Sequence, residues 1–442
     1  MKRFIIHTFG CQMNVCDSER ISDILCDSGW EYASFDDDAD LVIFNTCCVR
    51  ESAEERALGR LTLMKPWRRA KACRILALCG CIAQKEGDKL LSRFPFLDLV
   101  VGTRDFHLFP KLLDDVIAQK RPRSFTNRIE QPLSEIDSPR RSGDLSAFVN
   151  IIYGCDNFCS YCIVPFVRGR EVSRYSGDIR REVESLIRSG VKEVCLLGQN
   201  VNSYKDAATG ADFPDLLRII DSIPGIERIR FTTSHPKDAS LKLIHAVRDL
   251  PHVCEQFHLP VQSGSDAILK AMNRRYSRGD YLKLVDRIRR NIPDAVITTD
   301  LLVGFPGETD QDFQDTVDLC QKARWDAAFM FMYSPRKGTS ALSLGDDVPL
   351  DLKKKRLAEL IRIQENISRE KNRALEGKTV EVLVERRAPR NPDQLSGKDR
   401  GGRTVVFPGK DQLRGRIVQV MINKTTAHTL IGTRLDFVTK PS

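Results

Sequence analysis

Several features are missing from this 442-residue sequence, and each absence narrows the class of protein. The longest apolar runs fall far short of the ~20 residues that a helix needs to cross a bilayer, so no membrane association is expected. The first seven residues, MKRFIIH, show no small-residue cleavage site, and we interpret them as a first strand, not a secretory signal. No internal repeat or low-complexity stretch stands out.

Cysteine, by contrast, is plentiful, with fourteen residues in the chain. In a chain of this size without an export signal, that number indicates metal or redox chemistry and not disulfides. We therefore expect a cytoplasmic protein, and a length of 442 residues suggests about three domains.

The formal charge of +9 is unevenly distributed. Residues 377–442 contain thirteen Lys and Arg against six Asp and Glu, a net charge of +7 in the last seventh of the chain. Such a run is often only a solvated surface. A concentrated basic module nevertheless favours a polyanionic partner, most simply RNA.

The first ~120 residues alternate short apolar runs with helical patterns, which is typical of a doubly wound parallel sheet. The expected strands cover 3–9, 41–46, 74–78 and 97–101. One helix is expected to begin near Asp17 and end by Gly29, and another to run from about Thr103 to Gln119. We predict an N-terminal domain over 1–122 and a Pro-, Arg- and Ser-rich linker over 123–146.

The central region, 147–376, predicts a second series of strands and helices. Its expected strands are 148–153, 193–197, 226–231, 253–259, 295–303 and 327–332, separated by helices such as 178–188, 214–222 and 310–323. Six strands are too few for a closed eight-stranded barrel, so we expect a partial, open (β/α)6 barrel. A long charged helix over 350–376 follows, and four short strands (379–386, 403–407, 415–421 and 429–431) predict a small β-barrel over 377–440.

Cys155, Cys159 and Cys162 form a C-x3-C-x2-C pattern directly after the first central strand. A cubic iron–sulfur cluster closed by protein takes four thiolates, whereas a local trio leaves one iron open. An open iron is a Lewis-acidic docking point. A zinc site or a purely structural cluster is the alternative.

The predicted order of strands brings three further cysteines together as candidates for one shared site. Cys11, Cys47 and Cys81 each follow a predicted strand of the N-terminal sheet, whose carboxyl ends meet at one edge. Their neighbours Cys16 and Cys48 remain open as rivals.

The sequence resembles the radical S-adenosylmethionine (SAM) methylthiotransferases along nearly its whole length. The motifs that carry the resemblance are TFGCQMN (8–14), NTCCVR (45–50), GCIAQ (80–84), GCDNFCSYC (154–162), IVP (163–165), RGRE (168–171), LLGQNVNSY (196–204), TSHP (233–236), HLPVQSGS (258–265), GFPGET (304–309) and a tail similar to TRAM RNA-binding barrels. Cys48 stands where the family usually has Ser or another small residue, and Cys47 aligns with the motif.

The resemblance implies two 4Fe–4S clusters, one on Cys155, Cys159 and Cys162 and an auxiliary one on Cys11, Cys47 and Cys81, with no catalytic side chains beyond these ligands. It also implies a methylthio transfer to C2 of an adenosine next to the tRNA anticodon, with SAM used both as methyl donor and as radical source. The motif wording is nearest to the branch acting on N6-isopentenyladenosine. The branches acting on threonylcarbamoyladenosine or on a ribosomal-protein aspartate usually have a different first motif, and they remain alternatives.

Physical reasoning adds candidate contacts. Residues at the ends of barrel strands tend to face the active site. On this ground the candidate SAM contacts are Gln199, Asn200, Ser234, Gln262, Gly304 and Glu308. Each of them could instead stabilise a loop or a turn. The candidate RNA phosphate contacts in the tail are Arg386, Arg387, Arg390, Arg400, Arg403, Arg414 and Arg416. Arg168 and Arg170 could meet a phosphate or carboxylate, or form a structural salt bridge.

Chemistry on a nucleobase requires the adenosine to be splayed from its loop, and we expect it to lie between the two clusters. The expected partners are the tRNA anticodon stem-loop and a flavodoxin- or ferredoxin-type electron donor, and the chain is expected to be monomeric. The competing hypothesis from another class is a non-catalytic iron–sulfur protein that binds RNA or senses redox state and has no affinity for SAM.

Overall fold

The computed structural model describes residues 2–48, 51–126 and 145–435, which fold into two compact units. The first unit comprises residues 1–212 with 336–340, and the second comprises 213–335 with 341–442. The division falls inside the predicted central domain. Most of the predicted linker, the Val49–Arg50 end of the second motif and the end of the tail lie outside the described residues.

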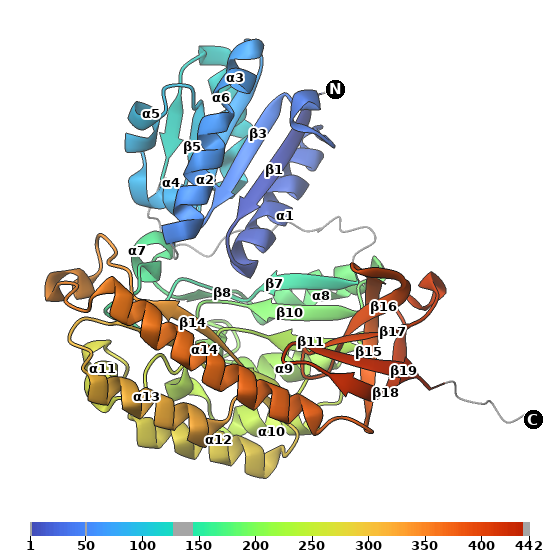
Figure 1. The fold of residues 1–442 in the computed structure, drawn as a ribbon. Coiled ribbons are helices and arrows are strands. Elements are labelled where there is room, and N and C mark those ends of the chain that lie inside the picture. The colour runs from blue at the N-terminus through green and yellow to red at the C-terminus, as the bar shows by residue number, and fades with distance from the viewer. Residues whose placement is uncertain (1, 49–50, 127–144, 436–442) are drawn as a thin grey trace, which may run out of the picture. The chain divides into compact units, whose positions relative to one another are not determined.

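The first unit contains a six-stranded parallel sheet in the order β2-β1-β3-β4-β5-β6 (Figure 1). Its strands are β1 (Arg3–Phe9), β2 (Glu31–Tyr32), β3 (Leu41–Thr46), β4 (Ile75–Gly80), β5 (Leu99–Val101) and β6 (Arg123–Phe125). Its helices are α1 (Gln12–Asp27), α2 (Glu51–Leu63), α3 (Lys65–Ala70), α4 (Cys81–Glu86), α5 (Lys89–Arg93) and α6 (Phe109–Gln119). The strand β6 lies where the sequence predicted the start of the linker.

Helices cover both faces of this sheet because the side chains of its buried strands alternate between two cores. In β3, Val42 and Phe44 pack with α2, α3 and α4, whereas Leu41 and Ile43 pack with α1 and α6. This arrangement confirms the doubly wound prediction.

The same unit continues into the first strands of the central region. Strands β7 (Ser146–Asn150) and β10 (Glu193–Leu197) pair in parallel, and β8 (Ile152–Tyr153) pairs antiparallel with β9 (Val172–Ser173). The helices are α7 (Val164–Arg168) and α8 (Ser176–Arg188). The predicted strand 148–153 is therefore two strands, interrupted at Ile151, with the three-cysteine loop following the second.

The second unit contains the remaining central strands, β11 (Arg228–Phe231), β12 (Gln256–His258), β13 (Val296–Val303) and β14 (Ala327–Met332). The last three form a parallel sheet, and Ile229 of β11 bridges in parallel to Val253. Their helices are α9 (Phe213–Asp221), α10 (Leu241–Asp249), α11 (Asp266–Ala271), α12 (Arg278–Asn291), α13 (Asp310–Ala323) and α14 (Leu350–Arg373). All six predicted central strands are thus present, two in the first unit and four in the second.

The tail of the second unit is a closed five-stranded barrel in the order β15-β16-β17-β19-β18 (Figure 1). Its strands are β15 (Thr379–Ala388), β16 (Asn391–Asp399), β17 (Thr404–Pro408), β18 (Ile417–Thr425) and β19 (Thr429–Arg434). The sequence predicted four of them and missed β16, whose Pro392 and Gly397 are residues typical of turns. Within the described part of the chain, no helix is long and apolar enough to cross a bilayer.

Candidate functional site

Three loops bring cysteine thiols together at the carboxyl edge of the N-terminal sheet. Cys11 follows β1, Cys47 follows β3, and Cys81 begins α4 directly after β4. The Cys47 thiol is hydrogen-bonded to those of both Cys11 and Cys81. The convergence predicted from topology is therefore present.

Cys48 is a fourth thiol at the same place. It is buried and hydrogen-bonded to Cys81, whereas Cys16 lies on α1 and points its sulfur at the carbonyl of Phe148, 3.7 Å away. The structure therefore separates Cys16 from this group and leaves Cys48 beside it.

Glycine and asparagine residues fix the backbone that carries these thiols. Gly80, immediately before Cys81, has φ +91°, and a Cβ there would lie 2.4 Å from the Thr46 carbonyl oxygen. Asn14 donates to the Asn45 side chain at 3.1 Å and to the Thr46 carbonyl at 3.2 Å. The glycine of the GCIAQ motif is therefore required at position 80, because a side chain there would clash with the backbone of Thr46.

The charge state of the thiols reflects their contacts. The hydrogen bond with Cys47 and the positive charge of Arg168 together lower the pKa of Cys11 to about 6, against the opposing effect of burial. Hydrogen bonds from Cys47 and Cys48 likewise lower the pKa of Cys81. The same hydrogen bonds raise the pKa of Cys47 and Cys48. Cys11 and Cys81 are therefore the two thiols whose surroundings favour the thiolate, the form that binds iron.

Among the described residues, no group of three or more His, Cys, Asp or Glu side chains is arranged to hold a single metal ion. A cubic cluster makes a different demand, because each thiolate binds a separate iron. The chemistry of the donor set, three or four thiols on three loops beside a guanidinium, fits such a cluster.

The second group of thiols lies on the loop between β8 and α7. Cys159 is buried, and Cys155 and Cys162 are half-buried. The amide of Cys155 donates to the carbonyl of Gly169 at 3.2 Å, and the amide of Cys162 donates to the carbonyl of Cys159 at 2.9 Å. Gly154 has φ +74°, and a Cβ there would lie 2.1 Å from the Arg170 carbonyl oxygen. The segment after the cysteines therefore folds back to close their loop.

Two residues that the sequence analysis missed connect this loop to the N-terminal sheet. The Thr103 hydroxyl donates to the Val167 carbonyl at 2.9 Å. The Arg104 guanidinium donates to the carbonyls of Arg168 and Arg170 at 2.8 and 3.0 Å. Their position just beyond the carboxyl end of β5, at the edge where the thiols gather, was the signal that could have found them.

The predicted SAM contacts differ in how well the structure supports them. In the first unit, Gln199 and Asn200 follow β10. Oε1 of Gln199 and both polar atoms of Asn202 are buried and have no hydrogen-bond partner among the described residues. In the second unit, Ser234 follows β11, and its buried hydroxyl likewise finds no partner within the described part of the chain. Gln262 adopts φ +76° beside β13, where its amide donates to the carbonyl of Asp300. Buried polar atoms without partners are unusual in folded proteins and suit a polar ligand.

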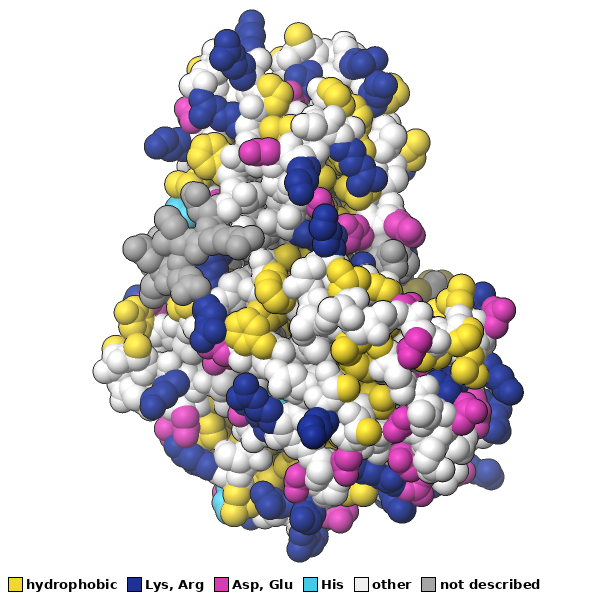
Figure 2. Space-filling model, turned by 90° about the vertical axis from the view of Figure 1, so that its left-hand side faces the viewer, with side chains coloured by type: hydrophobic (Ala, Val, Ile, Leu, Met, Phe, Trp, Pro, Cys, Tyr) yellow, Lys and Arg dark blue, Asp and Glu magenta, His cyan; other side chains and the backbone are white. Residues whose placement is uncertain are grey.

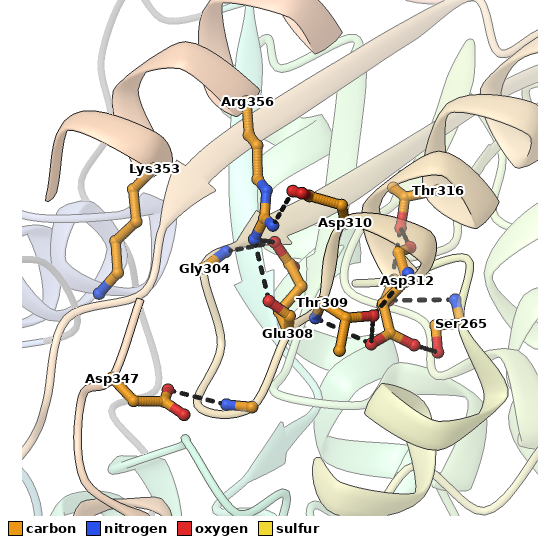
Figure 3. Close-up of polar contacts among 12 residues, drawn as sticks. Ser265, Gly304, Glu308, Thr309, Asp310, Asp312, Thr316, Asp347, Lys353 and Arg356 are labelled. Carbon is orange, nitrogen blue, oxygen red and sulfur yellow. Dashed lines mark hydrogen bonds and ion pairs between the residues drawn. The ribbon is translucent and has the colours of Figure 1, made fainter. Parts of the chain in front are cut away.

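Glu308 and Gly304 make contacts within the chain, and their contact with SAM stays a prediction. The buried Glu308 carboxylate accepts from the Gly304 amide at 3.1 Å and from the Arg356 guanidinium at 2.7 Å (Figure 3). A Cβ on Gly304 would lie 2.3 Å from the Lys353 side chain, so the aliphatic part of that residue covers the glycine. Two residues of α14 therefore hold the turn after β13.

The arginines of the barrel fall into two groups. Five are exposed and remain candidates for RNA contact: Arg386, Arg387, Arg390, Arg414 and Arg416. The other two, Arg400 and Arg403, bind carboxylates within the second unit: Arg400 reaches Glu255 at 2.8 Å, and Arg403 reaches Asp326 at 2.9 Å. RNA contact by all seven arginines stays a prediction, and these two have a structural partner as well.

The face in Figure 2 shows lysine and arginine side chains spread among acidic ones, not gathered in one continuous patch.

Comparison with known proteins identifies the family. Family models match residues 149–320 (radical SAM superfamily), 3–102 (uncharacterized protein family UPF0004) and 373–435 (TRAM domain). The chain is 45% identical over 438 residues to the tRNA-2-methylthio-N(6)-dimethylallyladenosine synthase of Moorella thermoacetica, covering 98% of this chain and 99% of the relative. The chain belongs to this synthase family.

A second synthase of the family, from Caldicellulosiruptor saccharolyticus, is 48% identical over 435 residues and covers 98% of this chain and 92% of its own. Among solved structures, the radical SAM methyltransferase TsrM from Kitasatospora setae, with cobalamin and a [4Fe-4S] cluster bound, matches with a TM-score of 0.57. It is 15% identical, covers 77% of each chain, and supports the fold alone. The fold is thus that of a synthase of this family: a parallel-sheet domain, a radical SAM domain and a TRAM barrel.

Proposed function

We propose that this chain is a sulfur-group transferase that adds a methylthio group to C2 of N6-isopentenyladenosine next to the anticodon of tRNA. The carrying observation is the full-length identity to synthases named for this product, together with the convergence of Cys11, Cys47 and Cys81 at one edge. The branches acting on threonylcarbamoyladenosine or on a ribosomal-protein aspartate are not favoured by these relatives.

The thiols have separate roles in this proposal. Cys155, Cys159 and Cys162 would hold the cluster that binds SAM, and Cys11, Cys47 and Cys81 would hold the auxiliary cluster. When bound, these groups supply a radical able to remove hydrogen from an aromatic carbon and the sulfur for the new bond. No general acid or base is required for that step, because the hydrogen at C2 is not acidic.

The remaining residues bind, orient and exclude water. The candidates for SAM contact are Gln199, Asn200, Ser234, Gln262, Gly304 and Glu308. Asn202 joins them because its side chain has no hydrogen-bond partner among the described residues. The adenosine would be splayed from its loop to lie between the clusters. The exposed barrel arginines would bind phosphates of the anticodon stem-loop. A flavodoxin- or ferredoxin-type donor, a cytoplasmic location and a monomeric state complete the proposal.

The deciding experiment is nucleoside mass spectrometry of tRNA from a strain lacking this gene. Loss of the methylthio-isopentenyl nucleoside, and its return on complementation, is expected. Its persistence in the deletion strain would rule out the proposed substrate.

A second assay tests the radical step. The protein reconstituted without oxygen should hold about eight irons per chain and release 5′-deoxyadenosine from SAM when reduced. A variant with Cys155→Ala, Cys159→Ala and Cys162→Ala should release none. Failure of the wild-type holoprotein to bind SAM would favour a non-catalytic iron–sulfur protein.

A further inference from the structure

A buried ion pair lies beside the N-terminal thiol group. Arg168, the last residue of α7, donates to the Asp17 carboxylate of α1 at 2.8 Å, and their side chains are only 6% and 3% exposed. Removing two charges from water is costly, and such a pair rarely improves stability over apolar residues of similar size. Its presence here calls for an explanation other than stability.

The guanidinium of Arg168 is also directed at the cysteines. It hydrogen-bonds the Cys81 thiol, and its charge acts on both Cys81 and Cys11. Val167 and Ile163 of the same segment pack in the core that contains Cys81, which holds α7 against α4. The contact therefore follows from the packing of two elements and not from one flexible side chain.

The position of Arg168 is fixed from three directions. Asp17 holds its side chain, Arg104 binds its carbonyl at 2.8 Å, and Gly169 turns the chain immediately after it with φ +78°. Arg168 also lies only six positions beyond Cys162. One residue thus connects the loop of the three-cysteine motif to the thiols of the N-terminal sheet.

Hydrogen bonds to the sulfurs and nearby charge are the means by which a protein sets the reduction potential of a thiolate-bound cluster. A buried charge acts strongly because little solvent screens it. A cation at this place favours the reduced, more negative state of the cluster, and an anion disfavours it.

We propose that Arg168 is a positioning residue for the auxiliary cluster: its guanidinium, held by Asp17, donates to the Cys81 sulfur and raises the reduction potential of the cluster bound there. The inference rests on the proposed function, since it requires a cluster on Cys11, Cys47 and Cys81. The proposal predicts that Arg168 raises the reduction potential of the cluster and that Asp17 lowers it.

The test uses the full chain with Cys155→Ala, Cys159→Ala and Cys162→Ala, so that only the auxiliary cluster remains. Its midpoint potential is measured by redox titration monitored by electron paramagnetic resonance, alongside iron and sulfide content. Arg168→Met should shift the midpoint potential to a more negative value, and Asp17→Asn should shift it to a more positive value. Arg168→Lys, which keeps the positive charge, should have a potential close to that of the parent. Arg170→Met is the matched control, because Arg170 is exposed and pairs with Asp156, and it should cause no shift.

Unchanged potentials in cluster-loaded Arg168→Met and Asp17→Asn, or shifts of the same sign, would overturn the inference. If Arg168→Met does not retain the cluster, the double variant Asp17→Asn/Arg168→Met leaves no unpaired buried charge and should titrate more negative than Asp17→Asn alone. Loss of the cluster from the double variant with a lowered unfolding temperature would show a folding role only. Absence of any cluster from the parent with Arg168 intact would instead refute the auxiliary site of the proposed function.

Discussion

At the scale of single residues, the two adjacent cysteines after β3 pose the sharpest question. The Cys47 thiol is hydrogen-bonded to both Cys11 and Cys81. The Cys48 thiol is hydrogen-bonded to Cys81 and packs in the apolar core with Phe44 and Leu78. A residue in contact with both other thiols is better placed to share a cluster with them.

We therefore expect Cys47→Ala to lose about four of about eight irons per chain, and Cys48→Ala to lose none. Cys48→Ala should still produce the methylthio nucleoside, with a modest loss of stability from the smaller side chain. Iron analysis of the two reconstituted variants measures this. The reverse pattern would assign the ligand to Cys48.

Asp206 is a buried carboxylate that stabilises the fold through hydrogen bonds. Its side chain is 1% exposed and accepts from the amide and hydroxyl of Ser176, which begins α8, and from the amide of Ala208. Burial acts to raise the pKa of Asp206, but the bonds from Ser176 and Ala208 outweigh it and lower the pKa to about 2.

Because the folded pKa of Asp206 lies below its ordinary value of 3.8, its stabilisation is complete above about pH 4 and is lost as the pH falls through 2. The contribution is about 2 kcal/mol at neutral pH. Asp206→Asn should lower the urea midpoint at pH 6 and much less at pH 2. Asp114→Asn, at an exposed carboxylate of α6, is the control and should differ little from wild type at either pH.

At the scale of elements, α14 shows how a helix rich in charge becomes a structural support. Its buried face carries polar side chains at helical spacing. Gln364 donates to the Trp325 carbonyl at 2.9 Å, Ser368 to the Asp326 carbonyl at 2.8 Å, and Lys371 to the Asp326 carboxylate at 2.7 Å. The sequence predicted the helix and its charge, but not that Lys353 and Arg356 are buried, because their partners Tyr333 and Glu308 lie earlier in the chain.

Arg356→Ala should destabilise the protein by about 3–5 kcal/mol, because it leaves the Glu308 carboxylate buried and unpaired. The two side chains are only 4% and 2% exposed. Lys354→Ala, two positions earlier on the exposed side of the helix and paired with Asp351, should cost about 0–1 kcal/mol. Denaturant unfolding of both variants measures the difference, and equal losses would contradict this account of the turn.

The elements also show what sequence reasoning could and could not reach. Strands β10 and β14 begin and end where predicted, because continuous apolar runs are bounded by clear turn signals. Strand β16 was missed because barrel closure, a non-local effect, overrides the turn preference of Pro392 and Gly397. The thiols at the sheet edge were predictable from topology alone. The pairing of Glu308 with Arg356, and of Arg403 with Asp326, was not, because sequence does not show distant partners.

At the scale of the whole molecule, the exposed barrel arginines should govern tRNA affinity. Replacing Arg386, Arg387 and Arg390 together by Ala should weaken binding at every salt concentration. The slope of log K against log salt should become shallower by about 2–3, since each lost phosphate contact removes about 0.7–0.9. Arg400→Ala should instead lower the unfolding temperature, because it breaks an ion pair with Glu255. An unchanged salt dependence in the triple variant would remove the barrel from the RNA surface.

The second unit also explains why its barrel cannot be treated as a detachable module. Arg228 of β11 is fully buried and donates to the carbonyls of Lys398 and Glu381, and Arg230 donates to the carbonyls of Asp399 and Arg400. A chain truncated after α14 would uncover both guanidiniums, remove Arg400 from Glu255, and remove Arg403 from Asp326, which would keep its ion pair with Lys371. Such a truncation would disturb the central strand β11 that binds the barrel, so the tail should be probed by point substitution.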